Sequence, residues 1–227
     1  MFWQDKEEEQ KVVTASDVVD VVFHIDCKML PAEHAYLLSR SIQSVLQWFD
    51  HEPLAGLHLI HGAESGNGWV RPESTAEGIL YLSKRTRLVL RLPLSRVAEA
   101  KLLLIDHVLT LGEFSIMVKQ AKIRPLSKLT TLFSRYVIDV SGESEHDFLS
   151  RAHQQLLDLG IQPKKLMAGR MNQLVFPDKI LHARSLMVAE LSDVETILLQ
   201  RSGLGLGRNV GCGIFIPQKD IKEVSAV

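Results

Sequence analysis

The sequence predicts an α+β protein built from two tandem ferredoxin-like (βαββαβ) domains. Runs of apolar and β-branched residues alternate with segments of helical periodicity in the order strand, helix, strand, strand, helix, strand. This order occurs twice along the 227 residues, and a polar stretch with a proline separates the two occurrences. A chain of this length can hold two small domains. We expect a loose acidic segment at residues 1–16, a first domain at 17–124 and a second at 125–227.

The first domain opens with a predicted buried strand at residues 18–25, which is apolar and rich in valine. Pro31 suits the first position of a helix. The apolar residues that follow Ala35 recur at helical spacing as far as Phe49. Residues 57–60 form a short predicted strand.

The remainder of the first domain contains a long loop and then strand, strand, helix and strand. The loop is predicted from three glycines and a proline close together. The predicted elements are a hairpin or loop at 61–77, paired strands at 79–82 and 87–92, a helix at 97–105 and a strand at 108–118 with a break at Gly112.

The second domain repeats the order after a polar connector at residues 119–133, which contains Pro125. Its predicted first helix is stopped by Gly160. A turn at Pro177-Asp178 joins the two middle strands. The predicted elements are strand 136–140, helix 145–159, strands 164–173 and 181–191, helix 193–200 and strand 212–216.

A glycine-rich loop joins the last predicted helix to the last strand. Glycine permits positive φ, and successive backbone N–H groups in such a loop can form an anion-binding nest. A dinucleotide-binding loop is excluded because strand must precede and helix must follow, the reverse of the order here. The alternative is that this loop is a glycine-rich turn needed only for the packing of the terminal strand. The residues we expect to contact a phosphate backbone are Arg201, Gly203, Gly205, Gly207, Arg208, Asn209, Gly211 and Gly213.

Charge is unevenly distributed along the chain, although the net charge is only -1. Residues 1–117 hold 11 basic and 16 acidic residues, and residues 118–208 hold 13 and 9. The second half is therefore the likelier anion-binding face. No apolar run approaches the roughly 18 residues of a membrane span, and the acidic start is no signal peptide. We expect a cytoplasmic protein without membrane contact.

Nine histidines are present, and His34 is distinguished by its place in the first turn of the first predicted helix. An imidazole at a helix N-terminus can face a phosphate and titrates near neutral pH. The alternative is a surface histidine at a helix start. His58 and His61 would point to opposite faces of a strand, the two cysteines form no zinc set, and no HExxH motif occurs. We expect neither a metal nor a cofactor.

The loop resembles the GhGxxxxxGhG loop, where h is apolar, of the repeat-associated RNA-binding proteins of CRISPR systems. Within that superfamily the chain is similar to the Cas-six endoribonucleases, and among these to the MYXAN subtype. Both the spacing and the C-terminal position of the loop match. The resemblance of the loop is carried by Gly203-Leu204-Gly205 and Gly211-Cys212-Gly213. The resemblance to the MYXAN subtype is carried by Leu30-Pro31-Ala32-Glu33-His34, by Gly205-Leu206-Gly207-Arg208, and by Gly211-Cys212-Gly213-Ile214-Phe215-Ile216-Pro217.

This resemblance implies two tandem ferredoxin-like domains and a metal-independent endoribonuclease that cuts CRISPR precursor RNA within its repeats. The ribose 2′-OH would attack, leaving a 2′,3′-cyclic phosphate and a 5′-OH, and His34 would be the catalytic general base or acid. The implied partner is a repeat RNA stem-loop, and further partners among the subunits of a CRISPR effector complex stay open. A hairpin of the second domain would insert at the base of the stem. The cations concerned are Lys164, Lys165, Arg170 and Arg184.

Two other functions fit the same residues. A catalytically silent repeat-RNA-binding subunit would share the glycine loop and lack the chemistry of His34. A ferredoxin-like protein that binds a small anionic ligand at the loop would bind free nucleotide as readily as hairpin RNA. For the hairpin cations, the alternative is a solvated strand edge protected by lysine.

Overall fold

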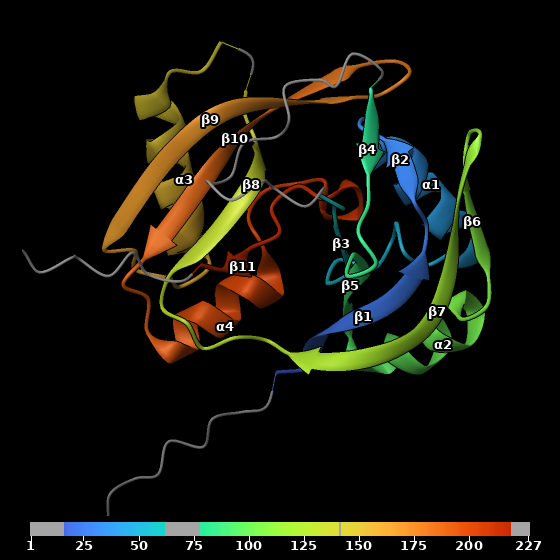
Figure 1. Cartoon of the computed structure of the whole chain (residues 1–227). Coiled ribbons are helices and arrows are strands. Elements are labelled where there is room, and N and C mark those ends of the chain that lie inside the picture. Colours follow the sequence, from blue (N-terminus) through green and yellow to red (C-terminus); the bar gives the residue numbers. More distant parts are fainter. Residues whose placement is uncertain (1–15, 62–77, 141, 219–227) are drawn as a thin grey trace, which may run out of the picture.

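The protein is described by a computed structural model that covers residues 16–61, 78–140 and 142–218. The loose acidic segment, apart from Ser16, and the predicted loop, apart from His61, lie outside the described residues. Two antiparallel sheets dominate the structure, and a short two-stranded sheet accompanies them (Figure 1). None of the described helices is long and apolar enough to cross a membrane.

The first sheet has five antiparallel strands, and two helices pack on one of its faces. Its elements are β1 (Val18–Asp26), α1 (Ala35–Val45), β3 (Gly56–His58), β5 (Arg87–Pro93), α2 (Leu94–Leu104), β6 (Val108–Leu111) and β7 (Phe114–Pro125).

The strand order β3-β5-β1-β7-β6 gives the ferredoxin-like arrangement, with β6 added at the edge as a hairpin partner of β7. Side chains alternate across β1, so Val21 and Phe23 point into the core. There they meet Leu38 and Ile42, which lie one turn apart on the buried stripe of α1. The predicted fold class is therefore confirmed for the first half of the chain.

The second sheet has four antiparallel strands, again covered by two helices. Ser144 caps the first helix by accepting from the N–H of Asp147, and Ser192 and Glu195 form a capping box on the second. The elements are β8 (Leu132–Ile138), α3 (Glu145–Asp158), β9 (Lys165–Val175), β10 (Ile180–Ala189), α4 (Asp193–Ser202) and β11 (Ile216–Pro217).

The order β11-β8-β10-β9 is the same ferredoxin-like arrangement as in the first sheet. Phe148 and Leu156 of α3 and Leu199 of α4 are fully buried against Leu186 and Val188 of β10. The helices α1 and α2 lie on the side of the first sheet away from the second, and α3 lies on the side of the second sheet away from the first (Figure 1). The helix-free faces of the two sheets are thus on the inner side of the molecule.

Two predicted details near the start of the first helix are wrong. Pro31 lies in a short strand, β2 (Met29–Pro31), and the helix begins only at Ala35. That strand pairs with β4 (Ile79–Tyr81), whereas residues 79–82 were predicted to pair with 87–92. Strand β5 instead lies between β1 and β3, because its leucines continue the core face of both neighbours.

Two further elements differ from their predictions. The predicted polar connector at 119–133 is in fact strand β7 as far as Pro125, because charged and apolar residues alternate there on a sheet with one helix-free face. The predicted last strand, 212–216, is reduced to β11, because the preceding residues belong to the glycine loop. The division of the chain into domains at residue 124 stays a prediction.

A compact apolar cluster joins the two halves of the chain. It brings the first residue of α1 against strands of the second sheet and against the glycine loop. Its buried members are Ala35, Tyr136, Leu174, Ala183, Val210 and Cys212.

Candidate nucleic-acid interface and active site

The glycine loop has a closed base that ties it to both neighbouring segments. The N–H of Gly213 donates to the carbonyl oxygen of Tyr136 in β8 (2.6 Å), and the N–H of Leu204 donates to the carbonyl oxygen of Gly213 (3.2 Å). A Cβ at Gly213 would overlap the carbonyl oxygen of Leu204, and the residue has a φ of +64°. Gly213 is buried, and the conformation of the loop therefore requires a glycine at this position.

The tip of the loop is exposed and carries amide groups that have no acceptor among the described residues. Leu206 is 80% exposed. The N–H groups of residues 210–212 donate to carbonyl oxygens within the loop. In contrast, no described residue accepts from the N–H groups of residues 205–209. Consecutive free amides in a turn of this kind form a concavity suited to an anion.

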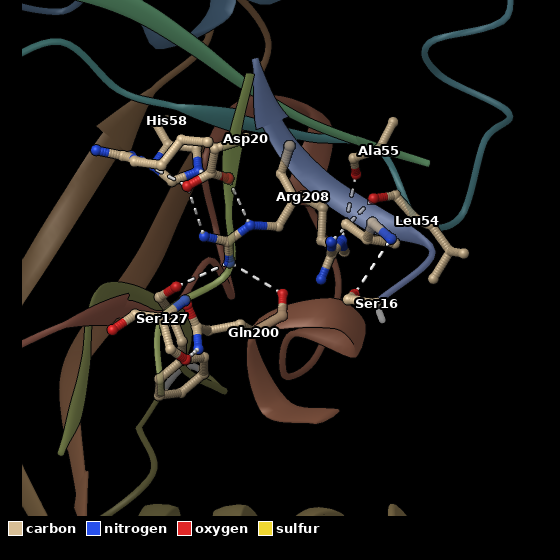
Figure 2. Close-up of polar contacts among 12 residues, drawn as sticks. Ser16, Asp20, Leu54, Ala55, His58, Ser127, Gln200 and Arg208 are labelled. Atoms are coloured by element: carbon tan, nitrogen blue, oxygen red, sulfur yellow. Dashed lines mark hydrogen bonds and ion pairs between the residues drawn. The ribbon is translucent and has the colours of Figure 1, made fainter. Parts of the chain in front are cut away.

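The two polar side chains at the centre of the loop are turned toward the protein. Arg208 is buried, and its guanidinium donates to the carbonyl oxygens of Ala55 (3.2 Å) and Leu54 (3.1 Å) (Figure 2). The amide of Asn209 donates to the carboxylate of Asp50. Burial, with the charges of Arg91 and Arg201, lowers the pKa of Arg208 to about 10, so it stays protonated at neutral pH. These contacts fix the loop on the first domain.

A fully buried arginine lies between the two domains (Figure 2 labels its partners Asp20 and Gln200). Arg91 of β5 donates through Nε to Asp20 Oδ1 (2.9 Å) and through Nη1 to the carbonyl oxygens of Gln200 (2.9 Å) and Phe215 (2.8 Å). Asp20 also accepts from Arg124 Nη2 (3.0 Å). The guanidinium thus connects the first sheet to both ends of the segment that contains the glycine loop.

Asp20 is the acceptor that compensates this buried charge. Burial alone would raise the pKa of Asp20, but the hydrogen bond and charge of His58, together with Arg91, outweigh it and hold the pKa well below its ordinary value. His58 Nε2 lies 3.3 Å from Asp20 Oδ1. Burial also lowers the pKa of His58, against the opposing effect of Asp20.

His34 is buried, with 4% of its surface exposed, and occupies the N-cap position of α1. Its Nδ1 lies 3.0 Å from the carbonyl oxygen of Pro31, and its Nε2 accepts from the backbone N–H of Ile60 (3.2 Å). Because Nε2 must carry the lone pair to accept, the ring is the neutral tautomer with its proton on Nδ1. A plain surface histidine, the alternative considered from the sequence, is therefore wrong.

A pocket of about 360 Å³ lies beside this helix start, at the far end of the β9–β10 hairpin. Its wall combines apolar side chains with amides, one carboxylate and one imidazole. The lining residues are Glu33, Met171, Asn172, Gln173, Val175 and His182.

Some of the predicted RNA-binding cations are exposed on β9 or beside it, and the others form ion pairs with aspartates. Lys164 and Arg170 are exposed, and Lys165 is exposed while pairing with Glu190 Oε1 at 2.5 Å. Arg184 is buried, with its Nε 3.2 Å from Asp139 Oδ2. Arg201 forms two hydrogen bonds to Asp17 (2.7 and 2.8 Å). The structure thus places Lys165 and Arg170 on β9 and Lys164 directly before it, and leaves the RNA contacts of all five cations as predictions.

A family model described as Cas6 Crispr matches residues 19–220. The chain belongs to the Cas6 family. A protein of Myxococcus xanthus, CRISPR-associated endonuclease Cas6, is 27% identical over 199 residues, which cover 88% of this chain and 81% of the relative.

Solved structures share the fold of this Cas6 family member. A CRISPR associated protein Cas6 aligns with a TM-score of 0.60 at 11% identity, over 89% of this chain and 100% of the other. A Cas6-related protein from Pyrococcus furiosus aligns with a TM-score of 0.57 at 14% identity, over 91% and 99%. A structure titled as an RAMP protein binding different RNA substrates gives 0.57 at 14%, over 88% and 100%. These similarities support the tandem ferredoxin-like fold.

A second group of cations in this Cas6 family member was not predicted from the sequence. Residues opposite one another in antiparallel strands share a face. The register therefore places Arg87, Lys122 and Arg124 on the helix-free face of the first sheet, together with His24 and Asp20. The alternation of Lys122 and Arg124 around an apolar residue was the available signal, but that segment was read as a connector.

Proposed function

We propose that this protein is an endoribonuclease that cuts CRISPR precursor RNA within its repeats and releases guide RNA. The observation that carries the proposal is the family match across residues 19–220, supported by the endonuclease name of the Myxococcus relative. The free amides at the loop tip supply a place for a phosphate, as the glycine motif predicts.

RNA would be held mainly through its phosphates. The loop tip at residues 205–209 offers backbone donors. Exposed Lys164 and Arg170 of the second half of the chain and exposed Lys122 of β7 offer charge. Such contacts make affinity depend strongly on salt and little on base identity. The buried Arg208 would act indirectly, by holding the loop against the carbonyl oxygens of the first domain.

The proposed reaction is an attack by the ribose 2′-OH on the neighbouring phosphate, without a metal ion. The new bond joins the 2′-oxygen to phosphorus, the bond from phosphorus to the 5′-oxygen breaks, and the products are a 2′,3′-cyclic phosphate and a 5′-OH. One group must accept a proton and another must donate one. His34, neutral with its lone pair on Nε2, suits the base, provided that RNA binding replaces its bond to the Ile60 amide.

A catalytically silent RNA-binding subunit is the second candidate, and one observation favours it. Both ring nitrogens of His34 already have protein partners within 3.2 Å. A silent subunit would bind a repeat hairpin and leave it intact. The third function considered, binding of a small anionic ligand, predicts that free nucleotide competes with the hairpin at similar concentration.

Single-turnover cleavage of a repeat hairpin RNA, in excess EDTA, tests the proposal. We expect the wild type to cut, a substrate with 2′-deoxyribose at the scissile nucleotide to bind without being cut, and His34→Ala to be slower by roughly 10² to 10⁴-fold. Hairpin affinity should change little in His34→Ala, since phosphate charge dominates binding.

The possible outcomes separate the candidates. Tight hairpin binding without cleavage in any metal condition would favour the silent subunit. Cleavage that is lost in EDTA and restored by Mg²⁺ would contradict the metal-free reaction. His153→Gln on the exposed side of α3 is the matched control, and it should cut at the wild-type rate.

A further inference from the structure

The short sheet formed by β2 and β4, here called the ribbon, has one face in the core and one face in solvent. Leu30 and Leu80 lie opposite each other and both pack into the core of the first sheet. Side chains alternate along a strand, and opposite residues of antiparallel strands share a face. The neighbouring pair, Met29 and Tyr81, therefore lies on the outer face, where Met29 is 39% exposed and Tyr81 is 58% exposed. The ribbon thus displays an aromatic ring and a thioether side by side.

One end of the ribbon is basic. The N–H of Leu82 donates to the carbonyl oxygen of Lys28 (2.8 Å), which extends the ladder by one pair. Lys84 and Arg85 follow in the turn that leads to β5, and all three cations are exposed. The side chains of these three cations form no hydrogen bond or ion pair with any residue that the structure describes. Their charge is therefore available to an anion from outside the chain.

The other end of the ribbon leads to the proposed catalytic base. Pro31 is the last residue of β2, and its carbonyl oxygen lies 3.0 Å from Nδ1 of His34. Lys28 precedes Pro31 by three residues, which is about 10 Å along an extended strand. A chain of nucleotides held at the basic end of the ribbon thus lies within a few nucleotides of His34.

We propose that the ribbon binds single-stranded RNA beside the scissile phosphate. This inference rests on the proposed function, and it adds that the substrate carries unpaired nucleotides next to the cut. The ring of Tyr81 stacks on one unpaired base, and Met29 widens the apolar surface around it. The cations at the basic end bind the phosphates of the same strand. RNA is the partner that complements both the ring and the three cations.

Such a site distinguishes single strands from duplexes and does not read base identity. Every base has a π-face, so stacking on Tyr81 tolerates any base. In a duplex the neighbouring base pairs cover that face, whereas an unpaired base can turn onto a protein ring. The ribbon therefore selects RNA in which the stem of the repeat hairpin is followed or preceded by unpaired nucleotides.

The test measures the affinity of two RNAs by fluorescence anisotropy. Both are repeat hairpins with a short unpaired flank at the scissile phosphate and 2′-deoxyribose at the scissile nucleotide, and in one of them the flank is abasic. We expect Tyr81→Ala to weaken the RNA that has bases roughly 5- to 100-fold, on the scale of one lost stacking contact, and to leave the abasic RNA unchanged. Tyr81→Phe keeps the ring and should bind both RNAs like the wild type.

The cations are tested on the same two RNAs. Joint replacement of Lys84 and Arg85 by alanine should reduce the slope of log affinity against log salt by about 0.7 for each phosphate contact that is lost. The reduction should be equal for the two RNAs, because an abasic flank keeps its phosphates. Leu102→Ala is the control for both experiments, since it removes a side chain of α2 that is 80% exposed, and it should bind both RNAs like the wild type.

The results separate a failure of this inference from a failure of the proposed function. Equal weakening of both RNAs by Tyr81→Ala would mean that the ring supports the fold or the stem contacts, and would overturn the inference. Unchanged affinity of Tyr81→Ala for both RNAs would overturn it as well, and would leave the outer face of the ribbon to a protein partner. A wild type that binds neither RNA would contradict the proposed function itself. Should Tyr81→Ala lose its thermal transition, Tyr81→Leu keeps apolar volume on the ribbon without a ring and takes its place.

Discussion

Arg91 donates from Nη1 to the carbonyl oxygen of Phe215 at 2.8 Å, across 124 residues of chain. The same nitrogen donates to Gln200, while Nε binds Asp20 on the neighbouring strand. One side chain of the first sheet therefore holds the end of the helix before the glycine loop and the segment after it. The position of the loop depends on the folding of the first domain.

Replacing Arg91 with methionine should destabilise the protein by roughly 3–5 kcal/mol. The carboxylate of Asp20 would remain buried without the opposite charge and hydrogen bond of Arg91. Urea unfolding, followed by far-UV circular dichroism, measures the change. Arg96→Met is the control, since Arg96 is partly exposed on α2 and pairs with Glu99; it should change stability by less than about 1 kcal/mol. Equal stabilities for the two variants would show that the buried arginine contributes nothing.

The contribution of Asp20 to stability should shrink in acid. Its pKa in the folded protein lies below the ordinary value of 3.8, so its stabilising effect is complete above pH 4. Below that pH the unfolded chain takes up a proton that the folded protein does not, and the wild type loses about 1.4 kcal/mol per pH unit from this group. Urea unfolding of wild type and Asp20→Asn between pH 6 and pH 2.5 should show their difference shrinking. A constant difference would contradict the assigned pKa.

Replacement by alanine should lower the free energy of unfolding more at Gly211 than at Gly205. Both have positive φ, which costs a residue with a Cβ about 1–2 kcal/mol. A Cβ at Gly211 would also overlap the side chain of Leu59, whereas a Cβ at Gly205 meets nothing within 4 Å. We expect an additional cost of about 1–3 kcal/mol at Gly211 from this overlap. In a Leu59→Ala background the two alanine substitutions should lower the free energy of unfolding by nearly equal amounts. If Gly211→Ala still costs more in that background, the overlap with Leu59 is not the cause.

Lys122→Ala should weaken RNA binding more at low salt than at high salt. If Lys122 on the helix-free face neutralises one phosphate, its loss should reduce the slope of log affinity against log salt by about 0.7–0.9. Filter binding of a repeat RNA between 50 and 300 mM salt gives the slope. Lys101→Ala, on α2 at the helix-covered side of the same sheet, should leave it unchanged. Identical slopes for wild type and Lys122→Ala would remove that face from the interface.

The fold was predictable because the residues that form its two cores recur in patterns between near neighbours in the sequence. The buried alternation of β1 and the helical stripe of α1 can be read from neighbouring residues, and the repeated element order gives the topology. Pairing across a long gap could not be read in this way. Nothing near Leu30 indicates that its strand pairs with Leu80, so Pro31 was interpreted as the start of a helix.

The candidate site was only partly predictable, for a related reason. The glycine motif identified the loop, but residue type alone does not say whether a guanidinium points to solvent. Arg208 was predicted to contact a phosphate backbone, yet it is buried against carbonyl oxygens that lie more than 150 positions away in sequence. His182 was one of nine histidines until the fold placed it in a pocket with Glu33.

Strand β9 is the outermost strand of its sheet, and it displays Met167 and Met171 to solvent. An open strand edge with apolar side chains is a template on which another chain can add, which leads to aggregation. Arg170, which is exposed on the same strand, opposes this by repulsion between the like charges of two copies, whereas Lys165 is paired with Glu190. Substitutions made there to abolish nucleic-acid contacts therefore weaken this protection against aggregation at the same time, and each such variant needs its monomer content measured before its affinity.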